Sequence, residues 1–266
     1  MKKMFLALTL LSASVFAADI STYLYGDFEP AAKVKSDLNE NGFEVVGEYD
    51  AMGDSQYHVV VYTCPGLKKV ASAKTRGFAG VQKVLVNSKD KKLVFTNPAY
   101  FMPAFLQDDN NPKIASKVNT KLEDTFGTLK GGDVKLEDDD IAGYHFMMGM
   151  PYYEDMIEIG EGSDLGKKLE ANAKENLVFK LKVGNATVYG VAMPTENGEK
   201  EFVTAINAAE HAAFLPYMVL VEGDTAYMLH GKYYLAISNP NLSMGDFMGI
   251  SSAPGDIEDY MTALVK

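Results

Sequence analysis

The chain has 266 residues and a formal net charge of −11, with 25 Lys and Arg against 36 Asp and Glu. A negative charge of this size repels phosphate backbones and anionic lipid, which argues against nucleic acid or a membrane surface as a partner. The chain contains one cysteine, Cys64, which excludes an internal disulfide.

The first 17 residues have the three parts of a secretory signal peptide. Lys2 and Lys3 form a positive start, residues 4–11 are apolar, and Val15 and Ala17 suit the positions before a cleavage point. The apolar run is shorter than the roughly 20 residues that a membrane-spanning helix needs. We expect cleavage after Ala17 and a soluble periplasmic protein, the alternative being a retained membrane anchor.

Hydrophobic periodicity predicts alternating helices and strands in the residues that follow. Gly42 is a stop signal for a first helix, and Pro98 ends a strand because proline cannot donate to a ladder. The predicted elements are a helix over 31–41, strands over 43–49 and 57–62, a helix over 67–78, a hairpin of strands over 81–87 and 92–96, and a helix over 112–126.

The later part of the chain predicts a similar series after an acidic linker over 127–140, which we interpret as a solvated loop. The predicted elements are a helix over 164–174, strands over 177–183 and 187–193, a helix over 200–214, a long hairpin over 217–238 and a helix over 256–264.

Comparison of the chain with itself finds three pairs of similar segments in the same order. Residues 60–65 are echoed by 189–194, 84–86 by 219–221, and 92–105 by 234–247. The last pair shares Asn-Pro-x-x-x-Met-x-x-Phe. We therefore predict an α+β fold made of two similar halves, 18–126 and 141–266, that pack together as a pseudo-dimer within one chain.

The first half resembles the DUF302 family, a group of small bacterial and archaeal domains without an assigned function. The resemblance rests on Asn41-Gly42-Phe43 after a helix, Tyr62-Thr63-Cys64-Pro65 at a strand-to-helix turn, and Val84-Leu85-Val86 before a hairpin. In the second half, 215–221 is similar to a Leu-Pro-containing strand of that family. The resemblance implies a TBP-like sheet domain that pairs with a copy of itself, and nothing about activity.

Four residues at repeated positions are candidates for ligand binding. Cys64 and Met193 each precede a proline near a helix start, where a thiol can be activated, although a buried thiol is the commoner outcome. Met102 and Met244 occupy the same place in the repeated Asn-Pro segment. They could line a shared apolar cleft or simply pack the core.

A segment rich in methionine suggests copper as a possible cofactor. His145, Met147 and Met150 combine imidazole and thioether groups, which suit Cu(I). In an extended segment His145 and Met147 would share one face and Met150 would lie on the other, which splits the ligand set. The competing interpretation is methionine as core packing.

No catalytic residues are assigned from the sequence. The histidines lack zinc-binding spacing, and neither a Gly-x-Ser-x-Gly elbow nor a Walker A pattern is present. We expect an exported, non-catalytic protein, monomeric or homodimeric, that binds a small molecule or a periplasmic protein. The alternatives are a copper or redox protein and an uncharacterised enzyme, which would show a pocket holding a strongly perturbed titratable group.

Overall fold

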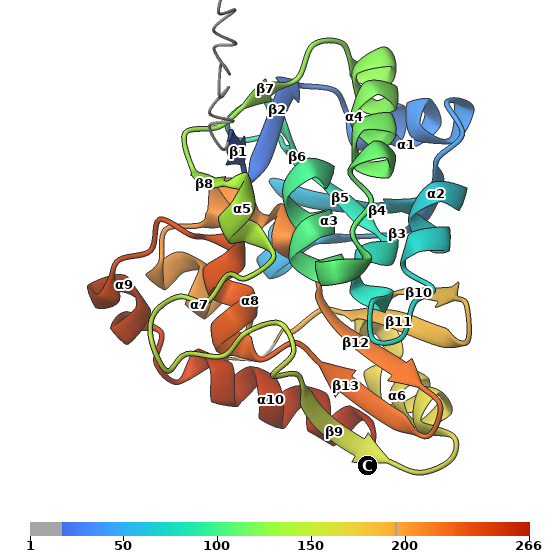
Figure 1. The fold of residues 1–266 in the computed structure, drawn as a ribbon, viewed down its shortest axis with the longest axis vertical. Helices are drawn as coiled ribbons and strands as arrows, with labels where there is room; N and C mark the ends of the chain where they lie inside the picture. Colours follow the sequence, from blue (N-terminus) through green and yellow to red (C-terminus); the bar gives the residue numbers. More distant parts are fainter. Residues whose placement is uncertain (1–17, 195) are drawn as a thin grey trace, which may run out of the picture.

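The structure is a computed structural model that describes residues 18–194 and 196–266 (Figure 1). The predicted signal peptide lies outside the described residues. Among the helices of the described part, none combines the length and the apolar character needed to cross a membrane.

The first half is built on a six-stranded antiparallel sheet with strand order β3-β4-β5-β6-β2-β7. Its predicted strands and helices are present, with β6 and α4 at the expected bounds. The elements are β1 (Asp19–Ser21), β2 (Tyr23–Asp27), α1 (Ala31–Glu40), β3 (Glu44–Asp50), η1 (Ala51–Gly53), β4 (Tyr57–Thr63), α2 (Pro65–Val70), η2 (Gly77–Gly80), β5 (Gln82–Asn87), β6 (Lys92–Thr96), α3 (Pro98–Leu106), η3 (Gln107–Asp109) and α4 (Pro112–Phe126).

The acidic linker contributes to the first half instead of forming only a loop. Its short strand β7 (Lys130–Gly131) extends the sheet beside β2, and β8 (Lys135–Glu137) pairs with β1. Helix α5 (Asp138–Ile141) then leads toward the second half.

The second half carries a five-stranded antiparallel sheet with strand order β10-β11-β12-β13-β9. Strand β10 has the predicted bounds. The elements are β9 (Ile157–Glu161), α6 (Leu165–Ala173), η4 (Lys174–Asn176), β10 (Leu177–Val183), β11 (Ala186–Val191), α7 (Glu199–Ala205), η5 (Ala209–Phe214), β12 (Tyr217–Glu222), β13 (Thr225–Met228), α8 (Gly231–Ser238), α9 (Met244–Gly249) and α10 (Ala253–Leu264).

The two halves share one strand order and one register, which confirms the predicted α+β fold of two similar halves. Val60 pairs with Val84 in the first half just as Tyr189 pairs with Val219 in the second. Each sheet also has a bulge at the start of its edge strand, β3 or β10. The first two repeated segments therefore mark equivalent positions.

The repeated Asn-Pro segment, in contrast, does not mark equivalent positions, and this expectation is wrong. Asn97 is the N-cap of α3 and its side chain accepts a hydrogen bond from Ala99 N at 3.0 Å, whereas Asn239 follows α8 at its C-terminus. The structural counterpart of Asn97 is His230, which caps α8 by accepting from Lys232 N at 3.1 Å.

The predicted hairpin over 217–238 is also wrong in its second arm, because residues 231–238 form helix α8. This segment is apolar and almost entirely buried. A short apolar run that is buried on all sides has no period that distinguishes a strand from a helix.

The helices predicted over 67–78 and 200–214 are shorter, and each is followed by a 3₁₀ turn that crosses to the other half. Turn η2 packs on β11 and β12, and η5 packs on β4, β5 and β6. A Cβ added to Gly77 would lie 2.4 Å from Leu220 Cδ1 and 3.1 Å from Val188 Cγ2, so a larger residue here would force these side chains of the other half to move. Each half thus contributes a turn that packs on the sheet of the other half.

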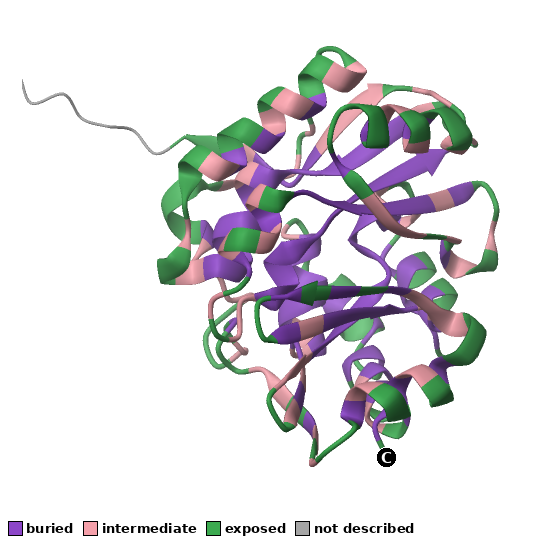
Figure 2. Cartoon of the chain, turned by 90° about the vertical axis from the view of Figure 1, so that its right-hand side faces the viewer, coloured by how far each residue is buried: buried purple, intermediate pink, exposed green. Residues whose placement is uncertain are grey.

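The edge strands β3 and β10 lie against each other where the halves meet. A Cβ on Gly47 would lie 2.3 Å from the carbonyl oxygen of Val178, so the two backbones approach as closely as glycine allows. Figure 2 shows buried residues along both sheets and between the two halves.

Candidate functional site

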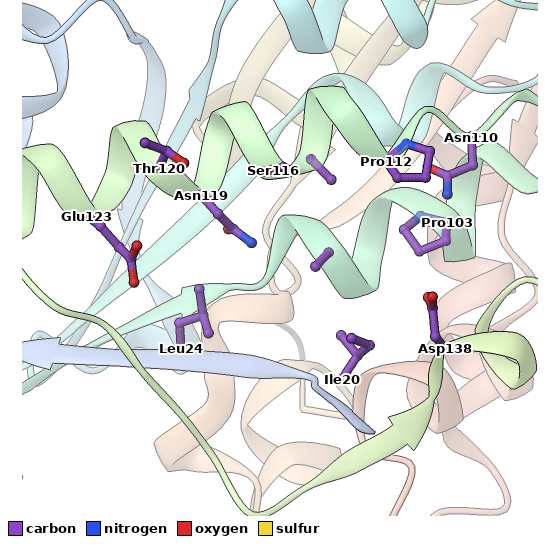
Figure 3. Close-up of a pocket in the computed structure, with 12 residues that line it drawn as sticks. Ile20, Leu24, Pro103, Asn110, Pro112, Ser116, Asn119, Thr120, Glu123 and Asp138 are labelled. Atoms are coloured by element: carbon purple, nitrogen blue, oxygen red, sulfur yellow. The ribbon is translucent and has the colours of Figure 1, made fainter. Parts of the chain in front are cut away.

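Two cavities of the molecule are candidate sites. The first, about 520 Å³, is a groove on the first half between α4, α3 and strands β1 and β2 (Figure 3). Its two carboxylates, Glu123 and Asp138, lie at opposite ends. Its lining is otherwise aliphatic, hydroxyl or amide, and buried Oδ1 atoms of Asn110 and Asn119 have no hydrogen-bond partner within the described structure.

The second cavity, about 370 Å³, lies where the two halves meet, and we call it the junction pocket. The first half contributes β3 and η1, and the second contributes η4, the start of β10, the residues directly after β11 and the start of α7. Small-molecule sites are commonly found at such boundaries. Its lining residues are Glu48, Tyr49, Asp50, Met52, Gly53, Glu175, Asn176, Leu177, Val178, Ala192, Met193, Pro194, Glu199 and Lys200.

Glu199 ties the halves together inside the junction pocket. It is the first residue of α7 and only 2% exposed. Its carboxylate accepts hydrogen bonds from the Tyr49 hydroxyl at 3.0 Å and the Met52 N–H at 3.1 Å, both of the first half. It also accepts from the Met193 N–H at 3.3 Å. A single carboxylate therefore accepts hydrogen bonds from both halves.

Burial raises the pKa of Glu199 to about 7, although its hydrogen bonds with Met52, Tyr49 and Met193 favour the charged form. The neighbouring Tyr49 hydroxyl has a pKa well above its ordinary value, first because of burial and second because of the Glu199 charge. A carboxyl group that titrates near neutral pH can both bind a cation and exchange a proton.

Lys83 is a second buried ionisable group at the same junction, 3% exposed. Its ammonium group donates to the carbonyl oxygens of Phe214 and Pro216 in the second half and to the Tyr234 hydroxyl. Burial lowers the pKa of Lys83 to about 7, while the charge of Glu199 acts in the opposite direction.

The outer lining of the junction pocket is acidic. Glu48, Asp50 and Glu175 are there, with Lys200 as the basic side chain of the lining and Lys35 paired with Glu48 at 2.6 Å. His58 lies beside them and its ring nitrogens contact Asp50 at 2.7 Å and Glu48 at 2.9 Å. The arrangement favours a cationic or hydrogen-bond-donating molecule.

The four predicted ligand-binding residues are not brought together. Met193 lines the junction pocket, whereas its counterpart Cys64 is a buried free thiol at the N-cap of α2. Met102 is fully buried in α3. Met244 begins α9 and is 41% exposed, so these two methionines lie on non-equivalent elements and line no common cleft.

The predicted copper ligands lie in a loop of turns between α5 and β9, not in an extended segment. Met150 N–H donates to the Met147 carbonyl at 2.9 Å, and the His145 ring packs on Tyr152 at 4.4 Å. Within the described residues, no group of three or more His, Cys, Asp or Glu side chains is placed to hold a metal ion. Copper binding through His145, Met147 and Met150 stays a prediction.

The sequence reasoning missed Tyr49, Lys83 and Glu199. Only one signal pointed toward them: Lys83 is a charged residue directly before the apolar run 84–86. The contacts of Glu199 join residues about 150 positions apart, which no local pattern reveals.

Comparisons with protein-family models, with curated proteins and with solved structures gave no match. The class of the protein is therefore defined by its own architecture, a duplicated antiparallel α+β fold with an acidic pocket between the halves.

Proposed function

We propose that this protein is an exported binding protein that holds a small cationic molecule, such as an aliphatic amine, in the junction pocket. The observation that carries the proposal is the buried Glu199 carboxylate, which both halves contact inside an acidic pocket of about 370 Å³. A volume of this size suits a small molecule. Export to the periplasm and kinship with DUF302 belong to the same proposal.

A bound ammonium group would favour the ionised form of Glu199. Because the pKa of Glu199 is about 7 in the free protein, binding at neutral pH should release part of a proton. This coupling distinguishes specific binding in the pocket from attraction to the acidic surface, which moves no proton from a buried group.

Calorimetric titration with straight-chain monoamines and diamines, and with carboxylates of equal length, tests the proposal. We expect amines to bind and carboxylates not to bind, with a heat that depends on the ionisation enthalpy of the buffer. Glu199→Gln should remove this proton release and weaken binding. Glu123→Gln, in the groove of the first half, is the matched control and should change neither. Equal binding by the Glu199→Gln variant would refute the proposal.

An enzyme is the second candidate, because the junction pocket holds a strongly perturbed titratable group, which is the feature expected of an enzyme site. Glu199 and Tyr49 would then transfer a proton to or from the bound molecule. Incubation of the same amine in heavy water with the wild type or with Glu199→Gln, followed by proton nuclear magnetic resonance, separates the two roles. Exchange of a carbon-bound proton of the amine with the wild type alone would indicate catalysis, and no exchange with either protein supports binding.

A further inference from the structure

The large apolar side chains that are exposed in the described structure gather on two segments. Met147, Met148 and Tyr152 belong to the loop between α5 and β9, and Met244 and Met248 belong to α9. We call these five side chains the methionine patch. Met148 is 94% exposed and Met248 is 64% exposed, so they contribute almost no packing to the core.

The two segments form one surface although they lie about 100 residues apart in sequence. Phe146 stacks on Phe247 with ring centroids 4.8 Å apart and planes 22° from parallel. The neighbouring Tyr144 hydroxyl donates to the Ala236 carbonyl at 3.4 Å, which fixes the loop to α8. The same loop and α9 lie on one side of the second half in Figure 1.

Helix α9 is held firmly for so short an element. A capping box joins Ser243 and Asp246, in which Ser243 Oγ accepts from Asp246 N and the Asp246 carboxylate accepts from Ser243 N at 2.9 Å. The exposed methionines therefore sit on a positioned backbone, while their unbranched, polarisable side chains can adapt to the shape of a partner.

The two segments of the methionine patch carry acidic charges, and Arg76, which reaches the loop from the first half, is already paired with Glu154 at 2.9 Å and with Asp109 at 3.1 Å. Residues 136–166 and 233–265, which include both segments, contain no lysine or arginine. Asp246 lies between the two methionines of α9, and Asp155 accepts a hydrogen bond from Tyr152 N at 2.9 Å. Both aspartates are exposed. An anionic membrane would be repelled, whereas a basic protein segment would be attracted.

We propose that the methionine patch docks a basic amphipathic helical segment of another protein. Its apolar face would cover the five exposed side chains, and its lysines or arginines would pair with Asp155 and Asp246. This mode of recognition places an amphipathic helix on an adaptable apolar surface. The inference is independent of the junction pocket, which shares no residue with the patch.

Fluorescence anisotropy with a labelled helical peptide of about 18 residues, basic on one face and Leu-rich on the other, tests the inference on the full chain. Met148→Gln with Met248→Gln removes apolar surface and should weaken binding at least about tenfold. Asp155→Asn with Asp246→Asn should weaken it and reduce its dependence on salt. Glu123→Gln with Asp124→Asn, on α4, removes the same charge elsewhere and should leave binding unchanged.

Two control peptides sharpen the result, one with the same composition in scrambled order and one with acidic residues in place of the basic ones. Weak binding of both supports the patch. Equal affinity for the scrambled peptide, or full affinity in the methionine double variant, would overturn it. Tight Cu(I) binding that is lost in the methionine variant, together with no peptide binding, would assign the patch to metal instead. Unfolding midpoints equal to the wild type confirm that the variants are folded.

Discussion

Glu199→Gln should change how stability depends on pH, because the buried carboxyl prefers its proton. Burial raises the pKa of Glu199 from 4.5 to about 7. Between these values the folded state holds a proton that the unfolded state has released. Stability therefore falls as pH rises through this window, by ~1.4 kcal/mol per pH unit for one group.

Titration of Glu199 lowers the free energy of unfolding by about 3 kcal/mol in total. Most of this loss occurs between pH 5 and pH 8. The glutamine side chain of the variant cannot titrate, so the wild type should lose about 2–3 kcal/mol relative to the variant over that range. Urea unfolding at half-unit pH steps measures this. Titrating groups that do not interact with Glu199 cancel in the difference between the two proteins, whereas Lys83, whose pKa the Glu199 charge raises, contributes a smaller part of it.

A constant difference between the wild type and Glu199→Gln from pH 5 to pH 8 would refute the reasoning. It would mean that the carboxyl is ionised in the folded state throughout, with its three donors outweighing burial. Lower stability of the variant at every pH by itself would not decide the point, because an amide replaces one acceptor oxygen with a donor that faces N–H groups.

Lys83→Met should change the pH dependence of stability at higher pH and in the opposite direction. Burial lowers the pKa of Lys83 to about 7, so above that pH the unfolded state binds more protons than the folded state. Urea unfolding should therefore show the wild type gaining about 2 kcal/mol of stability relative to the variant between pH 7 and pH 9. His230→Ala should cost about 1 kcal/mol at neutral pH because its side chain caps α8, and Asn97→Ala should cost more because its buried Nδ2 also donates to the Ser21 carbonyl at 2.6 Å; a loss for Asn97→Ala no larger than that for His230→Ala would contradict this. The Cys64 thiol, 6% exposed, should react with a disulfide reagent at least about a hundredfold more slowly in the folded protein than in urea; equal rates would show that the thiol is accessible.

Much of the fold could be predicted because its elements carry local signals. Helix α4 begins with an Asn-Pro pair, Asn111 and Pro112, and ends before Gly127, and both boundaries follow from capping rules. Strands β6 and β10 alternate or run apolar between polar turns. The repeat was detectable because the central strands of both halves are apolar and share a register.

The errors occur where tertiary contacts decide the local structure. Turns η2 and η5 pack on the sheet of the opposite half, so the residues predicted to continue a helix instead cross the junction. Helix α8 is buried on all sides, which hides its period. The Asn-Pro similarity misled for a different reason: Asn97 starts a helix and Asn239 follows one, and both positions favour the same residue pair.

The candidate site could be predicted only in part. Met193 was selected from its place in the repeat and does line the junction pocket. Glu199 lies on α7, and its partners Tyr49 and Met52 come from the other half. A buried carboxylate has no sequence signature, because its burial is produced by chain segments that are remote from it.

Covalent fusion of the two halves has a consequence for the chemistry at their junction. A pair of identical chains related by a two-fold axis must present every junction residue twice, so a buried charge there would face its own copy. In this chain Tyr49 and Lys83 of the first half correspond to Leu181 and Met218 of the second, by strand register. The Tyr49 hydroxyl that donates to Glu199 and the Lys83 ammonium group therefore each occur once at the junction, because apolar residues occupy the corresponding positions of the other half.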